Sequence, residues 1–442
     1  MALNEGQKIN TVGSHTVKVL LAKPDRLELG EGGQGIVYKV EYDGKPMALK
    51  WFKKGAWKKP SDVYNNLKKN IDRKSPMDSS SEELFLWPKD ITEWVDGTFG
   101  YVMELRPKEY IEFTEVLVSE GDSGFPSFKA VVEVCIKIVS AFRLLHNAGY
   151  SYQDMNSGNF FIKPKTGQVL ICDNDNVAPN GTNMGVIGTP QYMAPEIVAN
   201  GETPSTHTDE FSLAVVLFLL LCRNHPLEGK RWVVPCLTPN IEEMLYGKDA
   251  LFIFDQFNDA NKPVPGVHDN ALSIWAYLPD YVKDAFVSAF SQEAIKNPNK
   301  RLRELDWLKV LVRFQSDIVK CPHCKNEIFI LNGSSTNCDE CRRLYTVKNT
   351  LELRDYSVPI AKNTRVYKCQ LGVCNAKDAL NLIARVVSKD NDPSVLGLMN
   401  MTENTLKGTT PSGKTNQIKP NDVIPIISGI SIEVSDSKIN II

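Results

Sequence analysis

Four glycines stand between two stretches of the chain that alternate apolar and polar residues, and this restricts the fold of the N-terminal part. The glycines are Gly30, Gly32, Gly33 and Gly35. A dinucleotide-binding glycine loop leads from a strand into a helix, whereas the alternation here resumes after the loop. With a turn signal at residues 42–45, the pattern from Val17 to Phe52 predicts three antiparallel strands and a glycine-rich hairpin.

The chain has 442 residues, which is too long for one hydrophobic core and predicts two to four domains. Its hydrophobic content of 42%, charged content of 24% and formal net charge of −2 are typical of a soluble globular protein and indicate no nucleic-acid partner. The longest apolar run, Phe211 to Cys222, is shorter than a membrane span, and the N-terminus lacks a signal-peptide pattern. We therefore expect a cytoplasmic protein without a membrane partner.

The glycine-rich hairpin and the strand after it could hold a phosphorylated ligand. Glycines let backbone N–H groups approach phosphate oxygens, and Val37 would lie on an adenine ring. Ala48 and Lys50 follow on the third strand, where the Lys50 ammonium would reach the phosphates from beneath the hairpin. The alternative is a hairpin without a ligand and a strand lysine that is simply solvated. These residues alone do not decide between the two.

Three further segments follow the hairpin in order. After a predicted helix from Phe128 to Ala148, residues 152–159 place an aspartate five residues before an asparagine. Asp173 then ends an apolar stretch, and residues 188–196 read Gly-Thr-Pro-Gln-Tyr-Met-Ala-Pro-Glu. In this order and at these spacings, the segments resemble the catalytic loop, the metal-binding segment and the end of the activation segment of eukaryotic-type serine/threonine protein kinases.

This resemblance implies an α+β chain with the bilobal protein kinase fold, in which residues 1–105 form the strand-rich N-lobe and residues 106–316 the helical C-lobe. It also implies ATP and Mg²⁺ as cofactors, and a protein substrate with a serine or threonine acceptor. The implied catalytic residues are Asp154, Lys50, Asn159 and Asp173. The implied nucleotide contacts are Gly30, Gly32, Gly35, Val37, Ala48, Lys50, Glu104, Arg106 and Phe161, of which Glu104 and Arg106 follow a predicted strand from Gly100 to Met103.

By the same resemblance, Asp154 is the catalytic base, and Asn159 and Asp173 bind Mg²⁺. Phe161, on the strand after Asn159, is expected to form the opposite wall of the adenine slot. The resemblance implies three further contacts: Thr189 with Asp154, Glu196 with Arg301, and Asp209 with backbone N–H groups of the catalytic loop. A simple helix N-cap is the other reading of Asp209, and it is compatible with this role.

Several residues depart from the kinase pattern. Tyr152 and Gln153 replace the histidine and arginine before the catalytic aspartate, so no arginine there can receive an activation-loop phosphate. Asn156 replaces a lysine that many kinases place on the γ-phosphate. Asn174 and Asp175 replace the phenylalanine and glycine that usually follow the metal-binding aspartate, and a role as a second metal ligand is open to Asp175.

The helix expected at residues 61–72 offers no glutamate to pair with Lys50, and Asn66, Asn70 and Asp72 remain open as substitutes. Together the departures leave an alternative function, a pseudokinase scaffold that binds nucleotide and recruits partners without catalysis. Thr182 is the only hydroxyl residue between the metal-binding aspartate and residue 188, and it is therefore the expected place for autophosphorylation.

Two CxxC pairs separated by thirteen residues lie in the predicted third domain, residues 317–347. They are Cys321 with Cys324 and Cys338 with Cys341. Four thiolates around one ion leave no open coordination position, so this spacing predicts a zinc ribbon whose metal is structural. A ribbon that binds nucleic acid is the alternative, but the segment has few basic residues.

Residues 348–442 contain short predicted strands and turn signals, and they resemble the β-sandwich of forkhead-associated modules. We expect an all-β module for docking or autoregulation, without an evident phosphothreonine site. The whole order of segments is similar to bacterial serine/threonine kinases of tellurite-resistance-type phosphorylation triads. That resemblance implies a cognate phosphatase and a von Willebrand factor A-type protein as partners in bacterial signalling.

Overall fold

The computed structural model describes residues 2–73, 84–119, 124–185, 188–372, 374–375 and 377–442. The chain divides into two compact units, each of which is described by itself. The first unit consists of Met1–Phe125, Leu144–Asn270 and Ala289–Arg301, and the second consists of Pro126–Arg143, Ala271–Ser288 and Leu302–Ile442.

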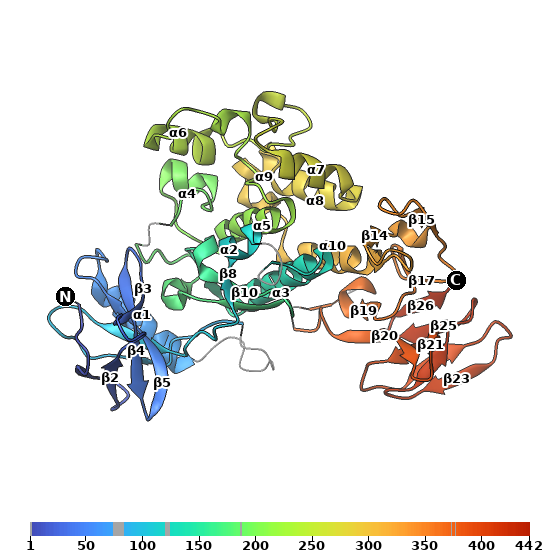
Figure 1. Ribbon diagram of the computed structural model, residues 1–442, viewed down its shortest axis with the longest axis horizontal. Coiled ribbons are helices and arrows are strands. Elements are labelled where there is room, and N and C mark those ends of the chain that lie inside the picture. The colour runs from blue at the N-terminus through green and yellow to red at the C-terminus, as the bar shows by residue number, and fades with distance from the viewer. Residues whose placement is uncertain (1, 74–83, 120–123, 186–187, 373, 376) are drawn as a thin grey trace. The chain divides into compact units, whose positions relative to one another are not determined.

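An antiparallel sheet forms the N-terminal part of the first unit, in the order β1-β2-β4-β5-β7-β6 with β3 paired to β4 (Figure 1). Its strands are β1 (Lys8–Asn10), β2 (Thr16–Leu20), β3 (Glu28–Glu31), β4 (Gly35–Tyr42), β5 (Lys45–Phe52), β6 (Asp90–Ile91) and β7 (Gly100–Met103). The turn between β4 and β5 lies where it was predicted. Between residues 17 and 52, however, the structure has four strands rather than three, because the glycine-rich hairpin includes the short strand β3.

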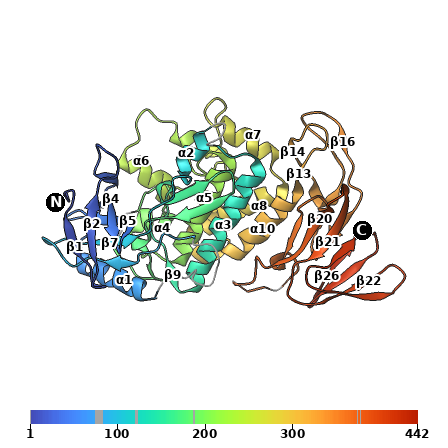
Figure 2. The same ribbon diagram turned by 60° about the horizontal axis from the view of Figure 1, so that its bottom comes forward.

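Helix α1 (Pro60–Arg73) covers this sheet, as Figure 2 shows. Its apolar residues Val63 and Leu67 are one turn apart and pack with Phe52 and Tyr101 of the sheet. The buried side chains of α1 also include Asn66 and Asn70. The helix therefore presents amide groups as well as methyl groups to the interior.

Helices and short strands make up the rest of the first unit. The helices include α2 (Phe113–Val118), α4 (Pro195–Asn200), α5 (Thr206–Cys222), α6 (Pro239–Glu243), α9 (Gln292–Lys296) and the end of α3 (Phe128–Asn147), and the strands are β8 (Ile111–Glu112), β9 (Tyr150–Ser151), β10 (Phe160–Lys163), β11 (Gln168–Ile171) and β12 (Ala178–Pro179). Helix α5 is buried over nearly its whole length, which explains its continuous apolar sequence. It begins at a capping box formed by Ser205 and Thr208.

The second unit joins helices to a β-rich C-terminal region. The helices are α7 (Asp269–Tyr277), α8 (Asp280–Ala289) and α10 (Glu304–Asp317), followed by two short hairpins, β13 (Ile318–Lys320) with β14 (Glu327–Phe329) and β15 (Thr336–Asn337) with β16 (Leu344–Tyr345). The sequence predicted helix α3 to within one residue of its end.

Two antiparallel sheets in the β-rich region share one hydrophobic core. One has the order β18-β17-β26-β25-β22-β23 and the other β19-β20-β21-β24. The strands are β17 (Thr350–Glu352), β18 (Ser357–Pro359), β19 (Arg365–Tyr367), β20 (Leu382–Lys389), β21 (Asp392–Asn400), β22 (Leu406–Thr409), β23 (Thr415–Ile418), β24 (Val423–Pro425), β25 (Ser431–Val434) and β26 (Ser437–Ile441). Val386 and Leu398 of one sheet pack in the same core as Ile432 and Ile439 of the other.

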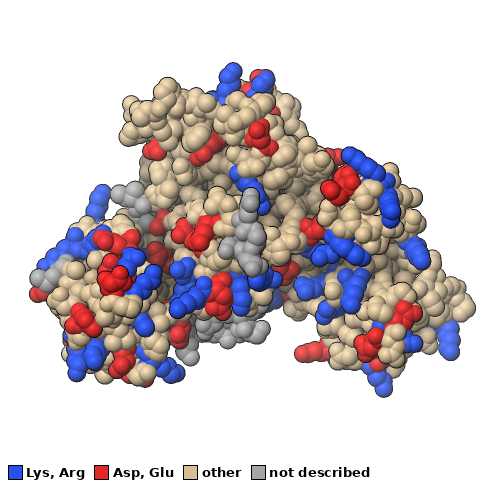
Figure 3. All heavy atoms as spheres, viewed as in Figure 1, with Lys and Arg blue, Asp and Glu red and all other residues tan. Residues whose placement is uncertain are grey.

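The surface carries charges of both signs, interspersed over the face that Figure 3 shows. This agrees with the small formal net charge of the sequence. Among the helices of the described residues, none combines the length and the apolar character needed to cross a bilayer.

A buried carboxylic acid lies at the end of α10. The Asp317 residue is inaccessible to solvent, and its Oδ2 accepts a hydrogen bond of 2.8 Å from the hydroxyl of Tyr281 on α8. Burial raises the pKa of Asp317 to about 7, although the Tyr281 hydrogen bond and the Arg313 guanidinium act in the opposite direction. The guanidinium of Arg313 stacks between the rings of Tyr281 and Tyr356, at 3.9 and 4.6 Å from their centroids.

The second unit should lose stability as the pH rises through the range that separates the two pKa values of Asp317. Between about pH 4 and pH 7 the Asp317 carboxyl is deprotonated in the unfolded state but still protonated in the folded state. This difference removes roughly 4 kcal/mol of stability above pH 7. Asp317→Asn should therefore raise the melting temperature at pH 8 and flatten its dependence on pH. The exposed Asp280 offers a control, and Asp280→Asn should leave the pH dependence unchanged. Parallel curves for wild type and Asp317→Asn would contradict this expectation.

Candidate active site

Lys50 on β5 is buried and pairs with two carboxylates that follow β11. Its Nζ atom lies 3.1 Å from Oδ2 of Asp173 and 2.9 Å from Oδ1 of Asp175. Tyr101 on β7 donates a second hydrogen bond of 2.9 Å to Oδ1 of Asp175. Burial by itself lowers the pKa of Lys50, but the two carboxylates outweigh it, so the pKa is raised and the ammonium stays charged. The structure thus brings together Lys50 and Asp173, which the sequence predicted, and adds Asp175 and Tyr101.

Asp209 holds the backbone of the segment that leads to Asp154. Its carboxylate accepts N–H groups from Tyr152 at 2.6 Å and Gln153 at 3.2 Å, as the sequence predicted. His146 Nε2 lies 3.0 Å from the same carboxylate. Gln153 has a φ of 71°, a conformation that side chains seldom adopt, so this carboxylate fixes a strained turn immediately before Asp154.

Asp154 is surrounded by asparagine side chains. Its carboxylate accepts hydrogen bonds from Asn156 at 3.3 Å and Asn176 at 3.2 Å, while Asn159 donates to its backbone carbonyl at 2.8 Å. Burial raises the pKa of Asp154 to about 6, the Asn156 hydrogen bond lowers it, and the charge of Asp173 raises it further. An acid with such a pKa is ionised at neutral pH and can still accept a proton.

Within the described residues no hydrogen bond joins Thr189 to Asp154, so the contact that the resemblance implies stays a prediction. Thr189 uses its backbone carbonyl to accept the N–H of Tyr192 at 2.9 Å, which closes a turn. The donors to the Asp154 carboxylate are the side chains of Asn156 and Asn176. Of these two, Asn176 was not singled out by the sequence, where it stands only as one more polar residue after Asp175.

The residues that depart from the kinase pattern, Tyr152, Gln153 and Asn174, make hydrogen bonds to backbone carbonyls. The Tyr152 hydroxyl donates to the carbonyl of Cys172, directly before Asp173. Gln153 donates to the carbonyl of Thr182 at 2.7 Å, which ties the catalytic loop to the segment after Asp173 without a phosphate. Asn174, in the place of the usual phenylalanine, is buried and donates to two backbone carbonyls, those of Leu86 at 2.8 Å and Ile171 at 3.1 Å.

Helix α1 does not supply the partner of Lys50. Asn66 and Asn70 each donate a hydrogen bond of 2.8 Å to the same carbonyl, that of Val177, and Asp72 is exposed. Asp175 takes the place that the sequence left open among Asn66, Asn70 and Asp72. The sequence signal that could have indicated the pairing of Asp175 with Lys50 was the acidic residue two positions after Asp173, since the residues that follow it up to Gly188 contain no further carboxylate.

The glycine-rich hairpin leaves room on one side. A Cβ atom added at Gly30 or Gly32 would meet nothing within 4 Å, whereas one at Gly35 would lie 2.6 Å from the backbone oxygen of Trp51. Strand packing therefore requires glycine only at the last of these positions. The open space at the other two is what close approach of a phosphate group would need.

The residues expected around an adenine ring lie in two clusters. Val37 packs with Ala48 and Met103, and Ala48 is buried opposite Met103 in the β5–β7 pair. Phe161 on β10 packs in the second cluster, with its ring 3.8 Å from the guanidinium of Arg106. The last predicted contact, Glu104, forms an ion pair with Lys89 at the surface.

Glu196 and Arg301 form the predicted ion pair, with both oxygens engaged at 2.8 and 2.7 Å. Arg301 also donates to the carbonyls of His207 at 2.8 Å and Ala294 at 3.2 Å. Its side chain is 2% exposed, so the charge is almost fully removed from water and depends on these partners.

The two CxxC pairs meet at the hairpins β13–β14 and β15–β16. All four sulfur atoms lie within 4.8 Å of one another, with 3.8 Å between Cys321 and Cys341 and 3.5 Å between Cys324 and Cys338. A tetrahedral zinc site with zinc–sulfur bonds of about 2.3 Å requires sulfur–sulfur distances of about 3.8 Å. The donor set and spacing therefore fit zinc. His323 lies beside Arg343 and is not part of this cluster.

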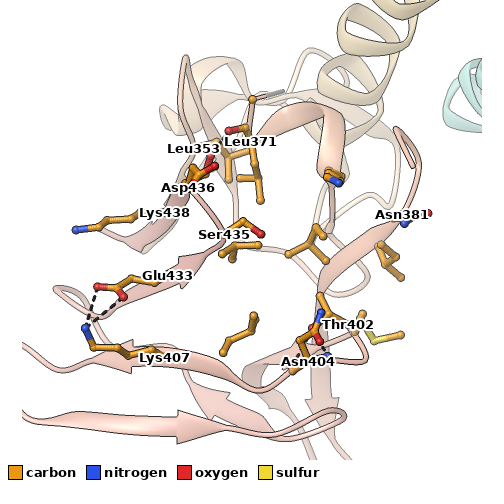
Figure 4. A pocket seen from close by; sticks show the side chains of 18 of the residues that line it. Leu353, Leu371, Asn381, Thr402, Asn404, Lys407, Glu433, Ser435, Asp436 and Lys438 are labelled. Atoms are coloured by element: carbon orange, nitrogen blue, oxygen red, sulfur yellow. Dashed lines mark hydrogen bonds and ion pairs between the residues drawn. The ribbon is translucent and has the colours of Figure 1, made fainter. Parts of the chain in front are cut away.

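A cleft of about 1360 Å³ opens in the β-rich region, lined by residues of both sheets (Figure 4). Lys407 and Glu433 face each other across adjacent strands and form an ion pair of 3.2 Å, which Figure 4 shows. Lys368, another basic residue of the lining, is paired with Asp378. The lining also contains the basic residues Arg354 and Lys438 and the acidic residues Glu403 and Asp436, so the cleft carries charges of both signs.

Comparison with known proteins assigns residues 25–234 to the protein kinase domain family model. Among curated relatives, the probable serine/threonine-protein kinase zyg-1 of Caenorhabditis briggsae is 21% identical over 233 residues, covering 50% of this chain and 30% of that protein. Serine/threonine-protein kinase ArnS of Sulfolobus acidocaldarius is 27% identical over 314 residues, covering 64% and 48%. The chain thus spans less than half the length of these relatives.

Among solved structures, a point mutant of the PknI kinase domain from Mycobacterium tuberculosis is similar with a TM-score of 0.43 and 17% identity. The match covers 70% of this chain and 98% of that chain. The matched residues contain the glycine-rich hairpin, Lys50, Asp154 and Asp173, and serine/threonine kinases are among the curated relatives.

Removing the buried cation at residue 301 should destabilise the first unit strongly. Arg301→Met leaves Glu196 and two carbonyls without their donor, and breaking a buried ion pair costs about 3–5 kcal/mol. Urea-induced unfolding measures this loss. The neighbouring Lys300 pairs with Glu293 at the surface, so Lys300→Met should change the free energy of unfolding far less. Equal effects of the two substitutions would show that the buried pair contributes no special stability.

Proposed function

We propose that this protein is a serine/threonine protein kinase that transfers the γ-phosphoryl group of Mg-ATP to a hydroxyl group of a protein substrate. The observation that carries the proposal is the convergence of three charged residues next to strand β4, which begins at the end of the glycine-rich hairpin. Lys50 pairs with Asp173, and the charges of both residues act on Asp154. The match to the protein kinase domain and the names of the relatives support it.

Each residue of the cluster has a definite task in this proposal. Lys50 would hold the α- and β-phosphates, and Asp154 would orient the acceptor hydroxyl and take its proton. Asp173 and Asn159 would hold magnesium, which when bound neutralises charge on the phosphates. The Asn159 amide nitrogen already donates to the Asp154 carbonyl, so the amide oxygen is the atom that can ligate a cation.

The alternative is a pseudokinase scaffold that binds nucleotide and recruits partners. The observation that favours it is the pairing of Lys50 with two carboxylates at once, together with Asn156 in place of a lysine near the γ-phosphate. Against it stands Asp154, whose carboxylate is held by asparagines and has a pKa of about 6. A scaffold has no physical need for a base of this kind beside a metal-binding aspartate.

Asp154→Ala should strongly slow phosphate transfer without abolishing nucleotide binding. Loss of a general base lowers the rate by roughly 10²-fold or more. The assay follows labelled phosphate from ATP to the protein itself and to a generic acceptor, with Asp259→Ala, an exposed aspartate, as the matched control. Transfer by Asp154→Ala at the rate of the Asp259→Ala control would refute the assigned base. Nucleotide binding with no transfer by the wild type would establish the scaffold instead.

We also propose that the four clustered cysteines bind a structural zinc ion as a zinc ribbon. The support is the fit of their sulfur distances to tetrahedral coordination, in a segment whose strands are only two or three residues long. Such short hairpins bury too little apolar surface to fold alone, and a metal would supply the missing stability.

Zinc removal should unfold residues 317–347. The purified wild type should contain one equivalent of zinc, and Cys338→Ser or a chelator should remove it and expose the segment to proteolysis. Cys236 is exposed and lies outside the cluster, so Cys236→Ser should retain the metal. A metal-free wild type that resists proteolysis would contradict the zinc assignment.

The cellular setting in this proposal follows the sequence resemblance to tellurite-resistance-type triads. A cognate phosphatase and a von Willebrand factor A-type protein are the proposed partners, and the cytoplasm is the proposed compartment. The β-rich region, residues 348–442, is the proposed docking module, and its cleft is a candidate surface for that task.

A further inference from the structure

We propose that Asp175 is the positioning residue of Lys50, so that the phosphate-binding lysine is set by the segment that carries the metal-binding aspartate and not by helix α1. The inference rests on the proposed kinase function for its catalytic consequence. The ion pair itself can be tested without catalysis.

The contacts around Asp175 fix its carboxylate in one position, and we call a residue that fixes Lys50 in this way an anchor. Its side chain has 0% exposure, and its two oxygens lie 2.9 and 3.2 Å from Nζ of Lys50. The Tyr101 hydroxyl fixes one of the same oxygens at 2.9 Å. A buried carboxylate with a charged and a neutral donor has a defined orientation, and it gives the ammonium a defined position in turn.

The backbone after β11 explains how two carboxylates reach one lysine. Asp173 has a φ of 53°, in the left-handed region, and Asn174–Asn176 continues as a 3₁₀ turn. This local geometry turns the side chains of Asp173 and Asp175 to the same ammonium, although they are separated by only one residue. Asp173 is 36% exposed and remains accessible to a cation, whereas Asp175 is enclosed.

Helix α1 has no carboxylate that could perform this task. Its only acidic residues are Asp62 and Asp72, and both are exposed. Its buried polar residues, Asn66 and Asn70, are both bonded to the carbonyl of Val177. The helix is thus fastened to the same segment, two residues beyond Asp175, through neutral hydrogen bonds. Displacement of α1 would break these bonds without removing the carboxylate from Lys50.

A second metal ligand is the competing role for Asp175. Its oxygens are already engaged by Lys50 and Tyr101, and its enclosure leaves no path for a hydrated cation. The two roles predict different responses to magnesium. A lost metal ligand is compensated by a higher magnesium concentration, whereas a lost anchor is not.

The first experiment is a double-mutant cycle on the protein without nucleotide, in which the melting temperature is measured for each variant. Lys50→Met leaves two carboxylates facing each other, so its melting temperature should fall by several degrees. Adding Asp175→Asn to Lys50→Met removes the unpaired buried charge and should recover at least half of that loss. Adding Asp72→Asn instead should recover nothing. The proposal fails at this stage if Asp175→Asn gives no recovery, whether or not the protein is a kinase.

The second experiment measures phosphate transfer against ATP and magnesium concentration. Asp175→Asn should lower kcat by about 10²-fold, the cost of a misplaced catalytic group, with a smaller change in KM for ATP and an unchanged magnesium midpoint. Asp175→Glu should restore part of kcat because it retains the charge. The double variant Asp62→Asn with Asp72→Asn, which removes every carboxylate of α1, should keep the wild-type rate.

Two outcomes of the second experiment would overturn the inference. One is rescue of Asp175→Asn by added magnesium, which would identify Asp175 as a metal ligand. The other is loss of transfer in the α1 double variant together with normal transfer in Asp175→Asn. A wild type that transfers no phosphate would refute the proposed kinase function, and the double-mutant cycle would then stand by itself as the test of the anchor.

Discussion

The pairing of the Lys50 ammonium with Asp173 and Asp175 is the interaction on which the candidate site depends. A charge removed from water is tolerated only when opposite charges and hydrogen bonds replace the lost solvation. The lysine lies on strand β5, the carboxylates lie after strand β11, and Tyr101 on β7 completes the arrangement. This single contact therefore joins the N-terminal sheet to the segment that carries Asp173.

Neutral hydrogen bonds hold helix α1 and the segment after Asp173 in place, where the kinase pattern has charged and aromatic residues. Asn66 and Asn70 fasten α1 to Val177, Gln153 holds the carbonyl of Thr182, and Asn174 bonds to two buried carbonyls. Bonds of this kind do not depend on phosphorylation or on salt concentration. In this arrangement the segment from Asp173 to Thr182 is held in place by hydrogen bonds within the fold itself.

The sequence predicted those features that depend on local pattern or on motif order. It predicted the β4–β5 turn, the limits of strand β7, the helix α3, the Glu196–Arg301 pair and the bonds of Asp209. It did not predict strand β3, whose four residues give too short a pattern to recognise. The partner of Lys50 was missed because spacing along a chain does not show that Asp173 adopts a left-handed conformation, which turns Asp175 toward the lysine. The Thr189 contact stays a prediction, since the donors to the Asp154 carboxylate in the structure are Asn156 and Asn176.

A crystal structure with magnesium and a non-hydrolysable ATP analogue would show directly whether Lys50, Asp154, Asn159 and Asp173 converge on one nucleotide. We expect phosphate oxygens within hydrogen-bond distance of Lys50 Nζ, magnesium bound by Asp173 and Asn159, and Asp175 still bonded to Lys50. An analogue bound elsewhere, or a lysine that makes no phosphate contact in the occupied site, would contradict this expectation.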